Sequence, residues 1–424
     1  MKKILSLFAV LGMVCLSSMA LAEVTVGGTV QLRSRNFDTM SFDKNNNTKD
    51  AVDTQERIQV DVNAKSDKVK GKITIWNDFE TWGNYENAQG KGFDTDATNS
   101  IGVTGNNVFG IREAWVSFDL PGVPLNVTGG HQLLMVGNGG FFRSLHYGSD
   151  AWVVSNVSGN NIAALVDVKI TEGTAASASD DIDAYVLLDV LKLNENMALG
   201  VNLAVIKDKK GVALPGKTAD YEAELQNLGV TFNGKLGPVV LKSEIDQQFG
   251  KAKGPVTDKK YKGSQIIVQG NVPMDPVTIN FLLGYGSGKK TTDNDRKEYV
   301  NFLDIDPHYT FLYEYKLNTA CGARNTGFCN TFAISAGAMF AATKSLNVGL
   351  DIFQLTANEK ITNGVGDEKK DIGMEIDAKV QWKLYDNLSW NWDIGYFKPG
   401  DAFKTSTGTT DAATGIQGIL AYKF

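Results

Sequence analysis

Apolar and polar residues alternate with a period of two along most of the chain. In the segment 374–384 the even positions are Met, Ile, Ala, Val, Trp and Leu, whereas the odd positions are Glu, Asp, Lys, Gln and Lys. The segments 24–35, 57–65 and 388–396 show the same alternation. Successive side chains of a β-strand point to opposite faces of its sheet, so this pattern predicts strands with one apolar and one polar face.

The alternation predicts eighteen strands, most of them about ten residues long, which suits a tilted strand that crosses a bilayer. The pattern is weakest in 151–157 and 162–171. Leaving out the first of these would make the count odd, whereas single-chain bacterial barrels have an even number of strands. The expected strands begin near residues 24, 55, 69, 111, 124, 151, 162, 182, 197, 222, 238, 263, 277, 331, 346, 372, 388 and 415.

Short turns alternate with long loops, as they do in outer-membrane barrels, where the short turns are periplasmic and the long loops extracellular. An unpaired backbone group in lipid costs several kcal/mol, so such a sheet must close on itself. We therefore predict an all-β fold: a transmembrane antiparallel β-barrel with both termini in the periplasm. The short turns include 66–68, 120–124, 233–237 and 385–387; the long loops include 36–53, 82–110, 134–149, 208–221, 249–262, 287–330, 357–371 and 398–414.

Both ends of the sequence favour the same location. The final strand alternates up to Tyr422 and Phe424, and this aromatic end resembles the segment by which outer-membrane barrels are recognised for assembly. Residues 1–22 combine two lysines, an apolar run and a small-x-small site before Glu23, which predicts a cleaved signal peptide. The domain expected after cleavage is a single barrel, 23–424.

The charge balance is acidic. The chain has 42 Lys and Arg against 48 Asp and Glu, and removal of Lys2 and Lys3 with the signal peptide would leave 40 against 48, a net charge of −8. No basic stripe suggests a nucleic-acid partner. After the leader no run of about 18 apolar residues occurs, so we expect no membrane-spanning helix.

Charged residues of both signs fall on the inward face of the expected strands. In a water-filled pore, walls of opposite charge create a transverse field that orients hydrated solutes. Each of these groups could instead serve only to keep the lumen hydrated. The candidate pore-lining residues are Arg33, Arg35, Arg57, Asp61, Lys70, Lys72, Glu113, His131, Arg143, Lys242, Glu244, Asp246, Glu375, Asp377, Lys379 and Lys383.

A glycine-rich segment, 137–143, lies within the expected loop 134–149. Glycines let the backbone fold tightly, and we expect this segment to enter the lumen and constrict it, with Phe141 and Phe142 against the wall and Arg143 towards the opening. The alternative is an ordinary exposed loop. If the segment is a constriction, deleting it widens the channel.

Cysteine and histidine are scarce. Cys321 and Cys329 lie in the longest loop, and in an oxidising envelope we expect them to form a disulfide that rigidifies it and stabilises the protein by roughly 2–3 kcal/mol. Metal binding with His308 is the alternative. The three histidines, at 131, 146 and 308, have no recognisable nucleophile partner. We therefore expect no enzyme activity, no catalytic residue, no metal and no cofactor.

The stretches 111–152 and 394–424 resemble the alginate-export family of outer-membrane barrels, a porin-like group with eighteen strands. The sequence departs from that family at His131, where the family has Arg, and at Asn138, where it has Asp. The resemblance implies the barrel fold and permits export of an anionic polysaccharide. It is carried by Ala114-Trp115-Val116, Pro121-Gly122-Val123-Pro124, Gly130-His131-Gln132 and Phe397-Lys398-Pro399-Gly400-Asp401, together with the grouping of Arg33 and Arg35 with Arg57.

These features predict an outer-membrane porin of a Gram-negative bacterium for passive diffusion of small hydrophilic solutes, since barrels of sixteen to eighteen strands leave an aqueous channel. The alternatives are a dedicated polysaccharide exporter and a structural or adhesive barrel with a blocked lumen. The expected partners are outer-membrane lipid and lipopolysaccharide, the barrel-assembly machinery and the solutes themselves. A homotrimer is slightly favoured over a monomer, and no nucleic acid is expected.

Overall fold

The structure is a computed structural model that describes residues 23–82, 109–173, 180–209, 222–254, 257–306 and 308–424. The expected signal peptide, 1–22, lies outside the described residues, as does most of the expected loop 82–110. Within the described ranges, no helix is long and apolar enough to cross a membrane.

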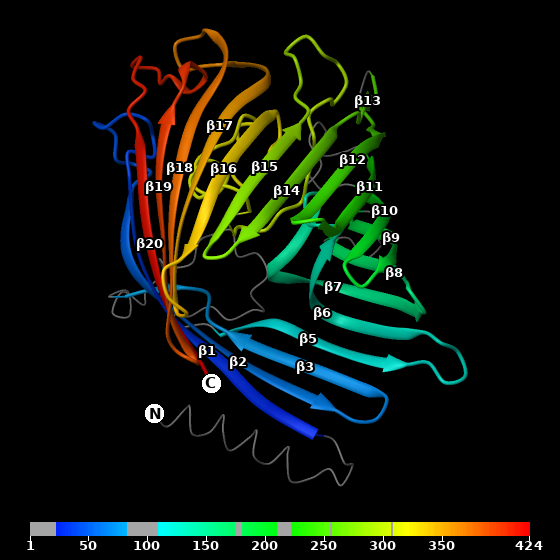
Figure 1. Ribbon diagram of the computed structural model, residues 1–424. Helices are drawn as coiled ribbons and strands as arrows, with labels where there is room; N and C mark the ends of the chain where they lie inside the picture. Colours follow the sequence, from blue (N-terminus) through cyan, green and yellow to red (C-terminus); the bar gives the residue numbers. More distant parts are fainter. Residues whose placement is uncertain (1–22, 83–108, 174–179, 210–221, 255–256, 307) are drawn as a thin grey trace, which may run out of the picture.

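One sheet contains all the described strands (Figure 1). Two of them, β4 (Glu80–Thr81) and β13 (Lys259–Lys260), are only two residues long. A single turn of 3-10 helix, η2 (Asp401–Phe403), follows β19. The other eighteen strands are β1 (Glu23–Asp38), β2 (Ala51–Lys65), β3 (Val69–Trp76), β5 (Gly110–Asp119), β6 (Asn126–Val136), β7 (Phe142–Ser158), β8 (Asn161–Thr171), β9 (Ile182–Asn194), β10 (Met197–Asp208), β11 (Ala223–Leu236), β12 (Val239–Ala252), β14 (Ser264–Met274), β15 (Val277–Gly286), β16 (Thr331–Ala341), β17 (Leu346–Thr362), β18 (Glu368–Tyr385), β19 (Leu388–Pro399) and β20 (Ala413–Lys423).

Each long strand pairs antiparallel with the next one along the chain, and the first strand also pairs with the last. The register between β1 and β20 runs from Thr29 opposite Lys423 to Asp38 opposite Thr414. This seam closes the sheet and leaves no edge for lipid to meet. The prediction of a closed antiparallel barrel with eighteen strands is confirmed.

The connections are sorted by length between the two ends of the barrel. The turns at the end where β1 begins and β20 ends are two to six residues long, whereas most connections at the opposite end are longer, up to the segment 287–330 (Figure 1). The predicted loop 134–149 is wrong, because β6 and β7 continue inwards as a hairpin whose turn is only 137–141. Backbone pairing continues there because buried amides and carbonyls need partners.

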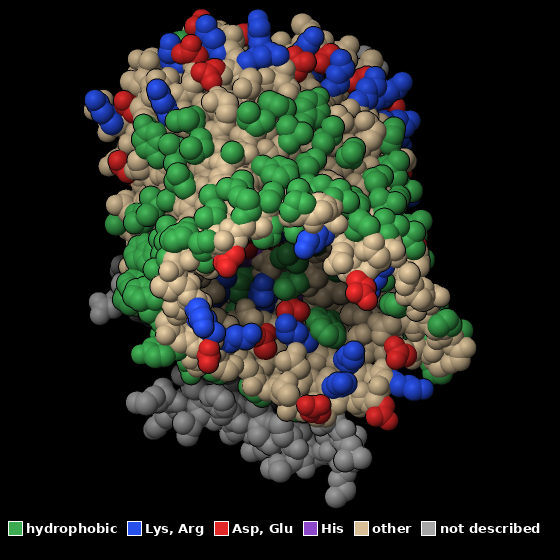
Figure 2. All heavy atoms as spheres, viewed as in Figure 1, with side chains coloured by type: hydrophobic (Ala, Val, Ile, Leu, Met, Phe, Trp, Pro, Cys, Tyr) green, Lys and Arg blue, Asp and Glu red, His purple; other side chains and the backbone are tan. Residues whose placement is uncertain are grey.

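The outer wall of the barrel is apolar. Figure 2 shows hydrophobic side chains covering a broad band of the surface, with charged groups concentrated beyond it. Outward residues such as Val230, Ile245, Ile334 and Leu350 are 40–54% exposed. Such a band on a closed barrel is the surface that meets lipid, so the protein is an outer-membrane type of barrel. Trp76 does not belong to this surface, because it points inwards and is 5% exposed.

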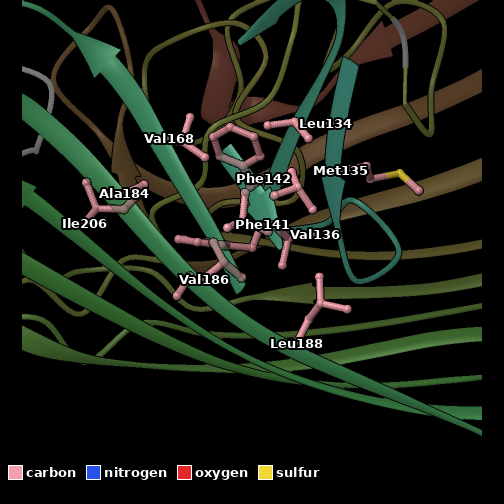
Figure 3. A pocket seen from close by; sticks show the side chains of 13 residues that line it. Leu134, Met135, Val136, Phe141, Phe142, Val168, Ala184, Val186, Leu188 and Ile206 are labelled. Atoms are coloured by element: carbon pink, nitrogen blue, oxygen red, sulfur yellow. The ribbon is translucent and has the colours of Figure 1, made fainter. Parts of the chain in front are cut away.

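Unexpectedly, much of the barrel interior is also apolar. One cluster joins the inner faces of β8 to β12 to the hairpin of β6 and β7, and a second joins β1 and β15 to β20 to the segment 309–328. The first cluster encloses a cavity of about 120 Å³ next to Phe141 and Phe142 (Figure 3). β8 therefore has apolar residues on both faces, and this explains why the alternation in 162–171 is weak.

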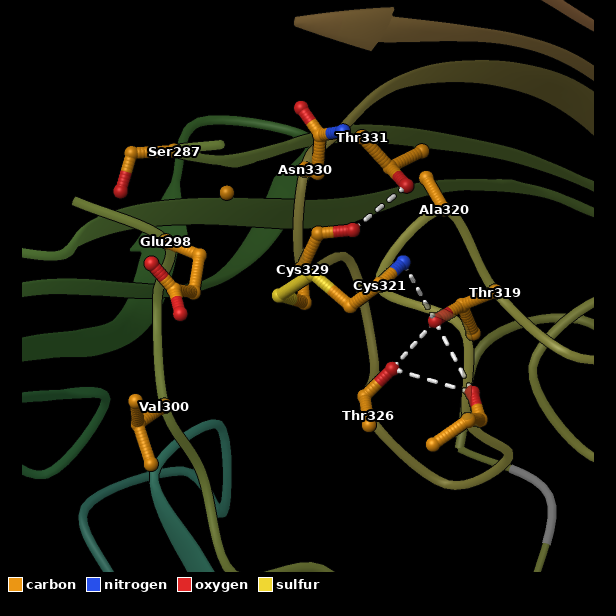
Figure 4. Close-up of a disulfide and its surroundings, with 12 residues drawn as sticks. Ser287, Glu298, Val300, Thr319, Ala320, Cys321, Thr326, Cys329, Asn330 and Thr331 are labelled. Atoms are coloured by element: carbon orange, nitrogen blue, oxygen red, sulfur yellow. Dashed lines mark hydrogen bonds between the residues drawn. A yellow bond between two sulfur atoms is a disulfide. The ribbon is translucent and has the colours of Figure 1, made fainter. Parts of the chain in front are cut away.

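The longest connection carries the disulfide between Cys321 and Cys329 (Figure 4). Cys329 is buried, and the amide of Cys321 donates to Thr319 Oγ1 at 3.3 Å. The segment around the bridge packs inside the barrel rather than extending from it, because Phe311, Leu312 and Phe328 belong to the second interior cluster. The bridge therefore fixes the shape of an inward-folded segment.

Candidate functional site: the solute pathway

The hairpin of β6 and β7 crosses the inside of the barrel. Its turn touches β12, which is not a neighbour of either strand in the wall. The amides of Asn138 and Gly140 both donate to Glu244 Oε2 at 3.0 Å, and Asn138 Nδ2 donates to the carbonyl of Ser243 at 2.8 Å. Phe141 is 1% exposed in the first interior cluster. The segment 137–143 thus narrows the lumen from one side.

A second inward segment, 302–328, packs on this hairpin. Phe302 donates its amide to the carbonyl of Phe141 at 2.7 Å, and its carbonyl accepts from the amide of Arg143 at 2.9 Å. Further along, the carboxylate of Glu375 on β18 accepts from the amide of Tyr313 at 2.8 Å. Two segments that are far apart in sequence therefore meet inside the barrel and are tied to different strands of its wall, β12 and β18.

Four predicted pore-lining acids turn out to be anchors for these segments. All four lie on the inner wall as the alternation predicts, but each is at most 1% exposed: Glu244, Asp246, Glu375 and Asp377. Their oxygens accept hydrogen bonds from the backbone of the inserted segments or from wall amides. They do not line water, and the prediction is wrong for them in this respect.

The open part of the lumen has a basic wall on β1 and β2. The register places Arg33 opposite Gln55, Arg35 opposite Asp53, and Arg57 opposite Gln31. Arg35 makes two hydrogen bonds to the carboxylate of Asp53, at 2.7 and 2.8 Å. Arg57 pairs with Asp78 in the connection after β3. Arg33 donates to the neutral side chain of Gln55 and makes no ion pair with any described residue.

Two further cations, which sequence reasoning missed, extend this wall. Arg112 on β5 donates to the carbonyl of His146 at 2.9 Å. Lys316, from the inward segment, places its Nζ 4.0 Å from the ring centre of Tyr315 and 4.9 Å from that of Phe37. A bulge between β3 and β5 interrupts the alternation at Arg112, so the sequence does not show that this side chain points inwards. For Lys316, no local pattern indicates that its loop turns inwards.

Aromatic rings separate the arginines of this wall. The Cζ atom of Arg33 lies 3.4 Å from the ring centre of Phe79, and that of Arg57 lies 3.8 Å from the same ring. Arg57 and Arg112 also lie over the indole of Trp76, at 4.7 and 5.1 Å. Cation–π contacts favour such stacking, especially where water is excluded.

The other predicted lumen charges lie nearer the short-turn end or are neutralised. Lys72 donates to Glu113 at 2.6 Å and lies 3.7 Å from Asp61. Lys379 pairs with Asp351 at 3.3 Å, and Lys383 pairs with the exposed Asp386 at 2.7 Å. Arg143, which lies on the hairpin, is 3.6 Å from the carboxylate of Asp304 in the second inward segment. The alternation places Lys70 and Lys242 on the inner face of their strands, and both side chains are exposed.

His131 contradicts its predicted place in the pore. In the ladder it pairs with Ala114 and with Asp150, and Ala114 pairs with Ile73, which is 48% exposed on the outer face. His131 therefore lies on the outward side of the sheet, where its Nδ1 is 2.8 Å from Asp150. The register of β6 is unbroken from Asn126 to Gln132, so His131 lies on the same side of the strand as Val127 and Gly129, and the bulge follows only after Gln132.

The two buried histidines each bridge two carboxylates. His146 lies 2.8 Å from Asp78 and 3.0 Å from Asp306, and His308 lies 2.9 Å from both Asp304 and Glu314. A ring that donates from both nitrogens must be protonated. Burial lowers the pKa of His308, but the carboxylates of Glu314 and Asp304 outweigh burial and raise it to about 9. The His146 bridge ties the segment around Asp306 to the hairpin, whereas the His308 bridge joins two residues of that same segment.

Tyr422 and Phe424, the expected assembly signal, lie at the β1–β20 seam. Their rings stack with centres 6.1 Å apart, and both side chains point to the outer surface. The amide of Phe424 donates to the carbonyl of Gly28 at 3.0 Å, and the amide of Gly28 donates back. The last residue thus completes the closing seam.

Comparison with solved structures identifies the fold. This is the fold of the outer-membrane porins. The chain is similar to a BenF-like porin from Pseudomonas fluorescens Pf-5 (TM-score 0.59, 9% identity, covering 95% of this chain and 98% of that one). It is also similar to OccAB4 of Acinetobacter baumannii (TM-score 0.57, 10% identity, 95% and 98% covered) and to OccK2 of Pseudomonas aeruginosa solved with glucuronate (TM-score 0.55, 12% identity, 95% and 96% covered).

Comparison at the sequence level adds no closer relative. No protein-family model matches the chain, and the comparison with curated proteins gives no match. The eighteen-stranded barrel therefore rests on the structure and its similarity to the Occ and BenF-like barrels. The resemblance to the alginate-export family stays a prediction.

Proposed function

We propose that this protein is an outer-membrane porin for passive diffusion of small hydrophilic solutes, with a preference for anions. It is proposed as a channel and not as an enzyme. The observation that carries the proposal is the basic wall: four arginines and a lysine gather beside a lumen narrowed by two inserted segments, and Arg33 has no carboxylate partner among the described residues. A narrow, basic passage attracts anions and excludes large solutes.

The comparisons are consistent with this solute class. OccK2, one of the barrels of similar fold, was solved in complex with glucuronate, a small hydrophilic anion. Glucuronate is therefore a suitable first probe for this chain. A carboxylate matches the planar fork of donors that a guanidinium presents.

Single-channel current across a planar bilayer tests the proposal. With a gradient of potassium chloride, the reversal potential gives the ratio of anion to cation permeability, and added glucuronate reports binding through block of the chloride current. The proposal predicts a stable conductance, an anion preference and a saturable block. A cation-selective channel without block would contradict the solute class.

A structural or adhesive barrel with a blocked lumen is the second candidate, and one observation favours it. Two apolar clusters and two inserted segments occupy much of the barrel interior. If they seal the passage, the refolded barrel conducts no current although it shows the heat-dependent gel mobility of a folded barrel. That result would direct attention to the long connections as a binding surface.

Export of an anionic polysaccharide receives less support. A polymer must pass through the whole length of the lumen, and the inserted segments leave little width for one. The exporter would show block by polymer fragments in addition to block by glucuronate.

The proposed location is the outer membrane of a Gram-negative bacterium, after removal of a signal peptide. The proposed partners are outer-membrane lipid, lipopolysaccharide and the barrel-assembly machinery, which would read Tyr422 and Phe424. A homotrimer is proposed over a monomer. Cross-linking in outer-membrane fractions checks this last point, because a trimer gives a product of three times the chain mass.

A further inference from the structure

Phe79 lies between two like charges. Its ring centre is 3.4 Å from Cζ of Arg33 and 3.8 Å from Cζ of Arg57. Two guanidinium groups this close to one centroid cannot both fit on the same face, so the ring separates them. The two distances limit the separation of the Cζ atoms to 7.2 Å. Like charges so near each other repel. The pair therefore persists only where other contacts hold the two side chains in place and offset this repulsion.

The backbone at Phe79 is unusual in a way that fits this placement. Its φ is +41°, a left-handed conformation that bulky residues rarely adopt. Such conformations persist where the surroundings hold the residue in place, and they occur often at functional sites. Here the strained residue projects its ring between side chains of β1 and β2, the two strands that carry the basic wall.

Stacking also determines which part of each arginine faces the lumen. The donors of a guanidinium lie in its plane, so a ring against its face leaves those edge donors available. Arg57 uses some of its donors on Asp78, whereas Arg33 donates only to the neutral Gln55 among the described residues. No carboxylate of the described residues therefore neutralises the charge of Arg33, and the ring fixes the orientation of its guanidinium group.

We propose that Phe79 is a positioning residue for anion selection: its ring holds Arg33 and Arg57 apart as a rigid pair whose edge donors bind the carboxylate of a passing solute. This inference rests on the proposed anion-selective function. Without the ring, Arg33 becomes mobile and can turn towards Asp53 or Asp78, which neutralises it. The contact of the solute is with the arginines, and Phe79 acts through them.

Substitution at position 79 tests the proposal. Phe79→Leu keeps an apolar side chain but removes the π face, and Phe79→Tyr keeps the ring. Phe403→Leu is the matched control, because Phe403 is a half-buried ring that stacks on Phe42, with centres 5.5 Å apart, and contacts no arginine in the described structure. The readouts are the permeability ratio of chloride to potassium and the glucuronate concentration that gives half-block, with conductance as a check of pore size.

We expect Phe79→Leu to weaken glucuronate block about three- to tenfold and to lower the anion preference, as the loss of two cation–π contacts implies. Conductance in concentrated salt stays near wild type, and Phe79→Tyr and Phe403→Leu behave like wild type. Equal block in Phe79→Leu and wild type would overturn the role of Phe79. If Arg33→Gln lowers block in the same series, the proposed function survives that result; if wild-type protein shows neither anion preference nor block, the proposed function itself fails.

Discussion

At the scale of single residues, the inner wall of this barrel assigns acids and bases to different tasks. Glu244 and Glu375 are buried and accept hydrogen bonds from backbone amides of the inserted segments. Arg33 remains in the passage without an ion pair in the described structure. A carboxylate can satisfy several amides at once, whereas a guanidinium can only donate. Acids therefore suit the anchoring of backbone, and arginines suit the capture of anions.

Lys316 makes the basic wall sensitive to pH. Burial, together with repulsion from Arg35 and Arg33, lowers its pKa to about 7. It is therefore mostly neutral at pH 8 and mostly charged at pH 6, so the wall gains a positive charge as the pH falls. We expect the anion preference of the wild-type channel to increase between pH 8 and pH 6.

The reversal potential at the two pH values measures this effect, and Lys316→Met serves as the comparison. The variant should show a smaller change than wild type over the same interval. An identical increase in both proteins would assign the pH dependence to another group.

At the scale of elements, the barrel narrows itself by turning two of its own connections inwards. The hairpin of β6 and β7 presents its apolar face to β8, β9 and β10, and its turn reaches β12. The segment 302–314 then covers the hairpin and reaches β18. Because both segments place polar backbone inside the barrel, each needs hydrogen-bond acceptors on the wall strands that it reaches.

Removing one acceptor should release the hairpin. Glu244→Ala leaves the buried amides of Asn138 and Gly140 without their partner, at a cost of roughly 1–3 kcal/mol for each group. We expect larger and noisier single-channel currents as the turn leaves the wall.

Glu368→Ala is a suitable control for this variant, since among the described residues Glu368 forms an ion pair only with Lys360 on the surface, at 3.6 Å. Currents of wild-type size in Glu244→Ala would show that the turn is held without Glu244, by its apolar contacts and its remaining hydrogen bonds such as that to the carbonyl of Ser243.

The bridge from His308 to Asp304 and Glu314 should hold the fold of the second segment in a pH-dependent manner. Its pKa rises from the ordinary 6.5 to about 9, so the stabilisation is fully present below pH 6.5 and is lost as the pH rises through about 9. The shift corresponds to on the order of 3 kcal/mol. Amide hydrogen exchange in 308–315, corrected for the intrinsic effect of pH, should therefore increase between pH 7 and pH 10.

His308→Gln should show the faster exchange already at pH 7 and lose most of the pH dependence. Equal protection in the variant and the wild type at pH 7 would show that the bridge does not hold this segment.

At the scale of the whole molecule, closure of the barrel depends on the seam between the first and last strands. Gly28 is essential to its geometry, because a Cβ there would lie 2.3 Å from the carbonyl oxygen of Gln59 and 2.6 Å from the ring of Phe424. Only a residue without a side chain lets the terminal phenylalanine lie against β1. The seam in turn satisfies the last open edge, which lipid cannot do.

We expect Gly28→Ala to reduce the fraction of chain that reaches the folded, heat-modifiable form in outer-membrane fractions. Gly71→Ala, on β3, is the matched control, because the nearest atom to its Cβ would be the carbonyl oxygen of Trp115 at 3.5 Å, an ordinary contact. A normal yield of folded Gly28→Ala barrel would show that the seam can shift to make room.

The barrel could be predicted from the local pattern of residues. Alternation with a period of two and the sorting of turns by length depend on lipid outside and water or polar groups inside, and these act on each strand locally. The positions of Arg33, Arg35 and Arg57 on one wall followed from the parity of β1 and β2. Where a bulge interrupts the alternation, as at Arg112, or where both faces are apolar, as in β8, the local pattern failed.

The content of the lumen, by contrast, follows from long-range packing. The inward course of 137–149 and 302–328 depends on contacts between residues more than a hundred positions apart, such as Asn138 with Glu244. No periodicity within either segment encodes such a contact. For the same reason Phe79 and Lys316 could not be assigned to the basic wall, and buried acids could not be told from pore-lining ones: alternation indicates the face of a strand, but the packing of other segments decides whether that face meets water.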